Sequence, residues 1–117
     1  MLFSGSGQVT YAGGGTSFIV PRGVFVDSSA RIYVTDDNTN LVYRFDDMSG
    51  TNQITYGGGG TPFVNPRGVY LDSSGRIYVS DNGNTTVYRF DDMIGTNQVT
   101  YNGGVTPFGG LFGIWVG

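Results

Sequence analysis

The segment Pro66-Arg67-Gly68-Val69-Tyr70-Leu71-Asp72 decides the fold, because the chain contains it twice in closely similar form. Its counterpart, Pro21-Arg22-Gly23-Val24-Phe25-Val26-Asp27, begins 45 residues earlier. Residues 21–65 align with residues 66–110 without a gap, and 30 of the 45 positions are identical. The chain of 117 residues is therefore built from tandem copies of one structural unit, with shorter pieces of the same unit at both ends.

Each unit reads as four short strands separated by polar turns. In the first unit, apolar and β-branched residues predict strands at residues 23–26, 31–35, 41–45 and 53–56. The segments between them are rich in Asp, Ser and Asn, which is typical of tight turns. No segment shows the apolar spacing of a helix, and the chain lacks Lys and Glu, two good helix formers. The predicted fold class is therefore all-β.

The composition excludes several kinds of functional site. The chain has no Cys and no His, all six basic residues are Arg, and all nine acidic residues are Asp. Without Cys and His, disulfides, the usual zinc sites and the Ser-His-Asp or Cys-His triads cannot form. A net charge of −3 disfavours a nucleic acid or an anionic membrane as partner. No run of about 18 apolar residues predicts a membrane span, and we recognise no secretory signal, so the localisation is left unassigned.

Four antiparallel strands in a tandem unit of 45 residues predict the blade of a β-propeller. The Pro-Arg-Gly segment at 66–72, followed by Gly75-Arg76-Ile77-Tyr78-Val79-Ser80-Asp81 and Val87-Tyr88-Arg89-Phe90, resembles the NHL repeat. The resemblance extends through both full units and both partial ones. The last partial unit departs from it, because Leu111-Phe112 stands where the earlier units have Pro-Arg. The resemblance implies a propeller of about six blades.

The repeat predicts one partial-propeller module over residues 1–117, with no separate domains. Its parts are an outer strand with its loop (1–20), a first blade (21–65), a second blade (66–110) and an extra inner strand (111–117). Units this similar are compatible with a fragment of a longer propeller, a recently duplicated gene, or an engineered or ancestral-type protein. The sequence does not separate these origins.

A propeller blade has two apolar faces, and it buries them only against neighbouring blades. Two complete blades cannot close a six-bladed ring, so we expect copies of the chain to associate. Three chains with two blades each would supply six blades, and a five-bladed dimer is the alternative. In such a ring a neighbour's segment Gln8–Tyr11 could exchange as an outer strand and displace Gln98–Tyr101. The residues expected at the contacts are Val9, Tyr11, Phe112, Ile114, Trp115 and Val116.

One face of the ring, beside the mouth of its channel, is the candidate ligand site. The connections between blades and the turns between second and third strands share this face, and they carry Arg22, Arg67, Asp36 and Asp81. The two Arg side chains could bind a carboxylate or a phosphate, so a small ligand or a glycan is the partner to consider. The interpretation we favour is that Arg22 and Arg67 pair with Asp36 and Asp81 and tie neighbouring loops together.

The remaining polar motifs predict turns rather than chemistry. The Gly run at 57–60 lacks the Lys and hydroxyl residue of a phosphate loop, and the Asp/Asn turns lack the spacing of a calcium loop. Six-bladed relatives include calcium-dependent hydrolases and lyases, and that resemblance implies His and Glu constellations, which this chain cannot form. We therefore expect no enzyme activity, no cofactor and no metal. The predicted function is a self-assembling binding or scaffold surface, and the alternative is small-ligand or carbohydrate binding at the channel mouth.

Overall fold

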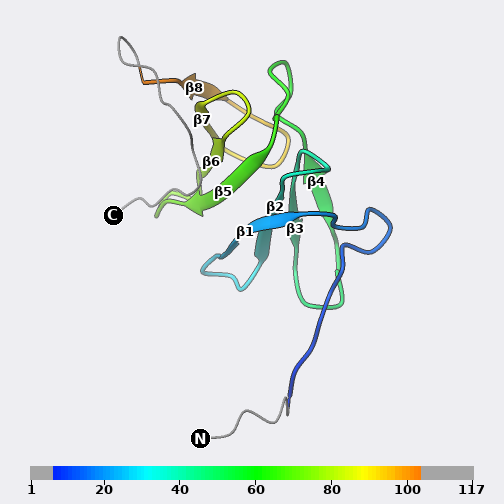
Figure 1. Cartoon of the computed structure of the whole chain (residues 1–117). Helices are drawn as coiled ribbons and strands as arrows, with labels where there is room; N and C mark the ends of the chain where they lie inside the picture. The colour runs from blue at the N-terminus through cyan, green and yellow to red at the C-terminus, as the bar shows by residue number, and fades with distance from the viewer. Residues whose placement is uncertain (1–6, 104–117) are drawn as a thin grey trace, which may run out of the picture.

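The computed structural model describes residues 7–103, and these form eight β-strands (Figure 1). The first four strands make blade 1 and the next four make blade 2. The strands of blade 1 are β1 (Pro21–Val26), β2 (Ile32–Asp36), β3 (Leu41–Phe45) and β4 (Ile54–Tyr56). The strands of blade 2 are β5 (Pro66–Leu71), β6 (Ile77–Asp81), β7 (Thr86–Phe90) and β8 (Val99–Tyr101).

Each blade is a four-stranded antiparallel sheet in which consecutive strands lie side by side, in the orders β1-β2-β3-β4 and β5-β6-β7-β8. The register is the same in both blades, since Val24 pairs with Val34 as Val69 pairs with Val79. The register shifts at the start of β1 and of β5, inside each Pro-Arg-Gly segment. Proline cannot donate a ladder hydrogen bond, so it is tolerated at such a strand start. The all-β fold and the four-strand unit predicted from the sequence are confirmed.

The turns between the first and second strands are built on an Asp side chain. Asp27 Oδ1 accepts hydrogen bonds from the backbone N–H groups of Ser29 and Arg31, each at 2.9 Å. Ala30 in this turn has a φ of 66°, and its counterpart in blade 2 is Gly75, with a φ of 81°. Glycine adopts this left-handed conformation without a Cβ clash. The turn therefore keeps the same shape in both blades, although one residue changes.

The outer strand expected at residues 8–11 would pair with a blade of another copy, so it stays a prediction. Residues 8–13 belong to no strand in the described part of the chain. The outer strand of a blade pairs with the third strand of that blade, and the described residues before β1 include no such partner. Residues 104–117, which contain the predicted inner strand at 111–117, lie outside the described residues.

The core lies between the two blades, which sit side by side with β5 against β1 and β2 (Figure 1). We call the face of blade 1 that meets blade 2 its trailing face, and the face of blade 2 that meets blade 1 its leading face. The trailing face contributes Phe25, Tyr33, Val42 and Tyr56 to the core. The leading face contributes Val69, Leu71, Ile77, Val79, Tyr88 and Phe90. Buried aromatic and branched side chains from both sheets make this junction the main apolar core of the described chain.

A second, smaller cluster repeats half of this arrangement on the leading face of blade 1. Tyr11 lies 4.8 Å from Phe45, as Tyr56 lies 4.9 Å from Phe90, measured between ring centroids. Phe18 likewise lies 4.7 Å from Tyr43, edge to face. Tyr11 and Phe18 therefore occupy, on blade 1, the places that Tyr56 and Phe63 occupy on blade 2, even though Tyr11 is outside any strand.

The junction has room for only a hydrogen atom at Gly23. A Cβ built there would lie 2.8 Å from the carbonyl oxygen of Arg67, 2.8 Å from Thr35 Oγ1 and 3.1 Å from the Cα of Gly68. Two of these atoms belong to the backbone of β5, which cannot move aside without separating the blades. Gly23 is thus required for the close approach of β1 to β5.

Substituting Gly23→Ala should lower the free energy of unfolding by about 1–3 kcal/mol, because the added methyl group forces the blades apart. Urea denaturation followed by near-ultraviolet circular dichroism measures this change. The matched control is Gly60→Ala, because a Cβ at Gly60 meets nothing within 4 Å. Equal stability of the two variants would contradict the close packing of the junction.

Candidate functional site

Asp36 and Asp81, two of the predicted ligand-binding residues, hold backbone segments in place. The carboxylate of Asp36 accepts hydrogen bonds from the N–H groups of Ile19 at 2.6 Å and of Asn38 and Thr39 at 2.9 Å. Asp81 does the same for blade 2, with Val64 N–H at 2.7 Å. Both side chains are buried. Each one ties the loop that enters its blade to the turn between the second and third strands.

The two carboxylates differ in their protonation behaviour. Burial alone would raise the pKa of Asp36, but the backbone N–H groups that point at it outweigh burial and lower the pKa below its ordinary value of 3.8. For Asp81 burial is the larger effect, and it raises the pKa despite hydrogen bonds from Val64, Asn84 and Gly83. These contacts give both carboxylates a structural role, and their predicted role in ligand binding stays a prediction.

The predicted basic residues Arg22 and Arg67 converge on a third carboxylate, Asp37. Asp37 Oδ2 lies 3.2 Å from Arg22 Nε and 3.2 Å from Arg67 Nη2. The expected pairing of the two Arg residues with Asp36 and Asp81 is therefore wrong. Both Arg residues do pair with an aspartate, but that aspartate is Asp37. The carboxylate of Asp36 contacts backbone N–H groups of its own blade, whereas that of Asp37 reaches both Arg residues. Its pair with Arg67 connects blade 1 to blade 2.

Two amide contacts accompany this ion pair across the blade junction. Asn65 Nδ2 donates to the carbonyl oxygen of Asp37 at 2.8 Å, and the N–H of Asn65 donates to Asn40 Oδ1 at 2.9 Å. We call the four residues Asp37, Asn40, Asn65 and Arg67 the junction clamp. Three of them were missed by the sequence analysis. These three residues differ between the two otherwise near-identical units, and that difference in the sequence could have identified them.

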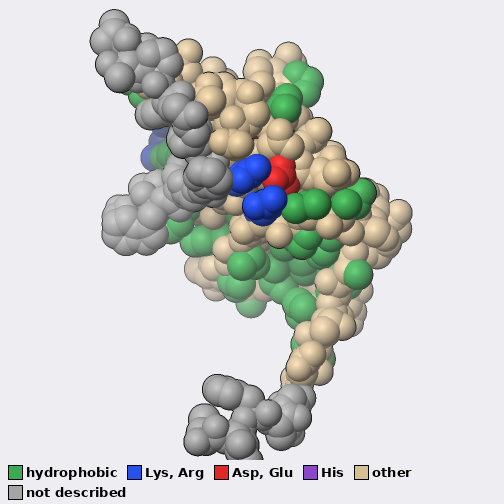
Figure 2. All heavy atoms as spheres, in the orientation of Figure 1, with side chains coloured by type: hydrophobic (Ala, Val, Ile, Leu, Met, Phe, Trp, Pro, Cys, Tyr) green, Lys and Arg blue, Asp and Glu red, His purple; other side chains and the backbone are tan. Residues whose placement is uncertain are grey.

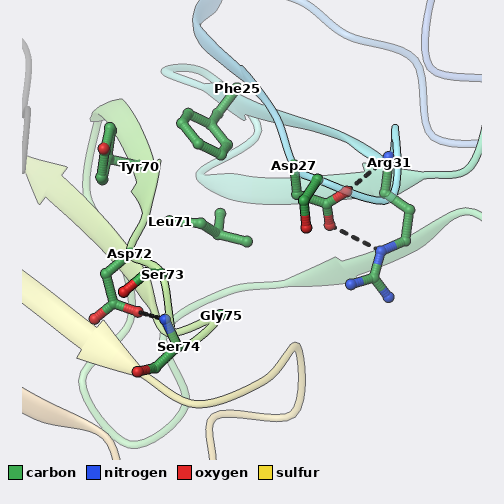
Figure 3. Close-up of a pocket in the computed structure, with 10 residues that line it drawn as sticks. Phe25, Asp27, Arg31, Tyr70, Leu71, Asp72, Ser73, Ser74 and Gly75 are labelled. Carbon is green, nitrogen blue, oxygen red and sulfur yellow. Dashed lines mark hydrogen bonds and ion pairs between the residues drawn. The ribbon is translucent and has the colours of Figure 1, made fainter.

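A cleft lies between the blades at the turns that follow β1 and β5, away from the predicted channel-mouth site (Figure 3). Its volume is about 640 Å³. The rings of Phe25 and Tyr70 lie 4.9 Å apart at an angle of 61°, and both line the cleft. The rest of the lining is polar and comes mainly from Asp27, Ser28, Arg31, Asp72, Ser73 and Ser74.

The carboxylates of the cleft are already engaged within the protein. Asp27 Oδ2 accepts from Arg31 Nε at 2.9 Å and from the Tyr33 hydroxyl at 3.3 Å, while Oδ1 accepts the two backbone bonds of its turn. Burial acts to raise the pKa of Asp27, but its hydrogen bonds with Arg31 and Ser29 outweigh burial and lower the pKa. What the cleft offers a ligand is aromatic surface and serine hydroxyls. This combination suits a neutral, hydroxyl-rich molecule better than an ion.

Blade 1 exposes on its leading face two residues of β1 whose counterparts in blade 2 are buried. Val24 is 68% exposed and Val26 57% exposed, whereas their counterparts Val69 and Leu71 are 6% and 7% exposed. A hollow of about 270 Å³ lies beside Val24. Apolar side chains spread over this region of the molecule, around β1, below a contact between basic and acidic side chains (Figure 2).

Blade 2 likewise leaves its trailing face less covered than blade 1 does. Tyr33 and Val42 of blade 1 are buried, but their counterparts Tyr78 and Val87 are partly exposed. These two residues line a hollow of about 190 Å³ together with Arg89, Val99, Thr100 and Tyr101. The described chain therefore ends in two open faces, and each corresponds to one half of the internal junction.

The predicted assembly residues fall into three groups. Val9 is exposed, so its predicted role stays a prediction. Tyr11 packs inside its own chain, and its hydroxyl donates to Gln53 Oε1 at 2.6 Å. The others, Phe112, Ile114, Trp115 and Val116, lie outside the described residues. Strand exchange between chains is therefore still a prediction.

Residues 7–103 contain no group of three or more acidic side chains arranged to hold a metal ion. They also contain no helix with the length and apolarity needed to cross a membrane.

Residues 63–90 match the family model of the NHL repeat. The matched segment runs from Phe63 through β5, β6 and β7, so it contains the motifs on which the resemblance was based. A comparison with curated proteins finds no match. The NHL repeat at 63–90 and the two four-stranded sheets together are compatible with propeller blades, and they confirm the predicted resemblance for this segment.

We expect the free energy of unfolding to fall as the pH drops below about 3.8, the ordinary Asp value. For Asp72, burial acts to raise the pKa, but hydrogen bonds from Arg76, Tyr78 and Ser74 lower it. A lowered pKa means that the unfolded chain takes up the proton first, so stability is lost as pH falls through the folded-state pKa. The pKa values of Asp27, Asp36, Asp47 and Asp92 are lowered as well.

The variant Asp72→Asn isolates one such group, because Asn can keep the turn while removing the charge. Urea denaturation at pH 6 and pH 3 should show a smaller loss of stability for this variant than for the parent. An equal loss in both proteins would contradict the role assigned to Asp72.

Proposed function

We propose that the chain is a self-assembling propeller module whose copies join head to tail. The trailing face of blade 2 in one copy would pack against the leading face of blade 1 in the next. The assembled blades then serve as a binding or scaffold surface, the use suggested by the NHL repeat. The single observation that carries the proposal is the internal junction, because it shows how one blade of this sequence covers the next.

The apolar part of the internal junction is present again on the two open faces. On the leading side, the residues at Val69, Ile77 and Val79 in blade 2 are Val24, Ile32 and Val34 in blade 1. On the trailing side, Tyr33 and Val42 are matched by Tyr78 and Val87, and Phe25 is replaced by Tyr70. The same backbone register presents both sets. A second copy can therefore repeat the contacts of the inner strands seen inside one chain, while Tyr11 and Phe18 of the docked copy already supply what Tyr56 and Phe63 supply at the internal junction.

Head-to-tail contacts of this kind are heterologous, and they close into a ring when the rotation per copy divides the full turn. Three copies with two blades each would make the six-bladed ring that the NHL resemblance implies. A five-bladed dimer remains the competing arrangement. Mass alone distinguishes the two.

Native mass spectrometry should give a species near three times the chain mass of 12.5 kDa. Val24→Asp should reduce this species to monomer, since it places a charge in the centre of the contact, where it would be desolvated. The fold should tolerate the change, because Val24 is exposed in the isolated chain. Ile94→Asp is the control, since Ile94 is 83% exposed and lines neither of the two hollows. A monomeric parent chain, or assembly by the Val24 variant, would rule out the proposed contact.

A second candidate function is the binding of a small neutral ligand such as a carbohydrate in the cleft. The observation that favours it is the pair of contacting aromatic rings, which offers an aromatic surface for a sugar ring beside serine hydroxyls. A glycan array compares the parent with Tyr70→Ala and Tyr70→Phe. Binding that survives in the Phe variant and is lost in the Ala variant supports stacking on this surface. Absence of binding by the parent, or equal binding by all three, excludes the cleft as the site.

A further inference from the structure

We propose that the junction clamp operates only inside the chain, so that copies meet through a junction with the apolar contacts but without the clamp. The contact between copies is then the weaker and separable one, and Asn82 is the residue that sets its strength. This inference rests on the proposed head-to-tail assembly and names what regulates it.

Each cross-blade polar contact of the clamp involves a residue whose counterpart at the open faces is a different amino acid. Asp37, which pairs with Arg67 across the junction, corresponds to Asn82. Asn40, which accepts the N–H of Asn65, corresponds to Thr85. Asn65 itself, which reaches back to Asp37 and Asn40, corresponds to Val20. Of the four clamp residues, only Arg67 is preserved in its counterpart, Arg22.

The backbone of the loop entering blade 1 also differs from that entering blade 2. The N–H of Val20 donates to the carboxylate of Asp36 in its own blade, at 3.2 Å. The N–H of its counterpart Asn65 donates across the junction to Asn40. A copy that docks its blade 1 onto a neighbour therefore presents Arg22 as the polar group, and the facing turn presents Asn82 instead of a carboxylate.

The apolar residues of the junction follow the opposite pattern, since they are identical or similar in the two blades. Burial of these side chains is non-directional and favours any close contact between the faces. Charge-assisted hydrogen bonds add strength and fix orientation. The junction between copies keeps the apolar burial and lacks most of the charge-assisted hydrogen bonds. It is therefore the junction at which an assembly separates.

Restoring the carboxylate with Asn82→Asp tests this inference. The new carboxylate would lie between Arg67 of its own blade and Arg22 of the docked copy, as Asp37 lies between Arg22 and Arg67. The adjacent pair Asp36 and Asp37 shows that this turn accepts two neighbouring carboxylates. We expect the dissociation constant between copies to fall about tenfold at low salt, the effect of one charged hydrogen bond. The gain should largely disappear at about 1 M salt, where exposed charges are screened.

The matched control is Ser49→Asp, which adds the same charge on an exposed turn of blade 1. Sedimentation velocity over a dilution series measures the dissociation constants, and a thermal melt shows that each variant is folded.

The outcomes separate this inference from the proposed function. A parent that assembles reversibly, with tighter assembly for Asn82→Asp but not for Ser49→Asp, supports both. A parent that assembles while Asn82→Asp leaves its dissociation constant unchanged overturns the inference alone. A parent that stays assembled at every dilution also overturns it, since the junction between copies is then not weak. If the parent and all variants stay monomeric, the head-to-tail assembly itself fails.

Discussion

The packing of one blade face against the next is the interaction on which the rest of this structure depends. A four-stranded sheet of these residues has apolar side chains on both faces, and a sheet cannot bury either face by itself. Inside the chain, the trailing face of blade 1 meets the leading face of blade 2, and Tyr33, Val42, Tyr88 and Phe90 become fully enclosed. Gly23 permits the approach of the backbones, and Asp37 ties the loops at one edge. The loops and the cleft take their places from this junction.

Much of this arrangement could be predicted from the sequence, because a repeat of 45 residues shows twice which positions are apolar. The strands, the turns and the enclosed positions such as Tyr43 and Phe45 follow from that pattern. The partner of the Arg residues could not be predicted in the same way. Asp36 and Asp37 are adjacent in sequence, and only the turn geometry decides which one points inward to backbone N–H groups and which one faces the next blade. The strand expected at residues 8–11 stays a prediction, because a strand exists only where another strand pairs with it and its partner would come from another copy.

Comparison of the two units separates contacts that recur from contacts that occur once. The apolar contacts recur, since each blade has nearly the same residues on both faces. The polar contacts of the junction clamp occur once in the described chain, because Asp37, Asn40 and Asn65 have no polar equivalents of the same kind at 82, 85 and 20. In the proposed assembly, this difference would make the junction between copies weaker than the junction inside the chain without changing the shape of the blade. The proposed assembly would thereby combine one permanent contact with one adjustable contact.

Cross-linking between two singly substituted chains tests the central claim, that the open faces are the two halves of the internal junction, most directly. The parent has no Cys, so Val24→Cys and Tyr78→Cys each introduce one thiol, at counterparts of Val69 and Tyr33, which share one buried cluster. A short thiol-specific linker should produce cross-linked dimers when the two variants are mixed and none from either variant alone. Dimers formed by one variant alone would show a symmetric contact instead, and an absence of dimers in the mixture would contradict head-to-tail pairing.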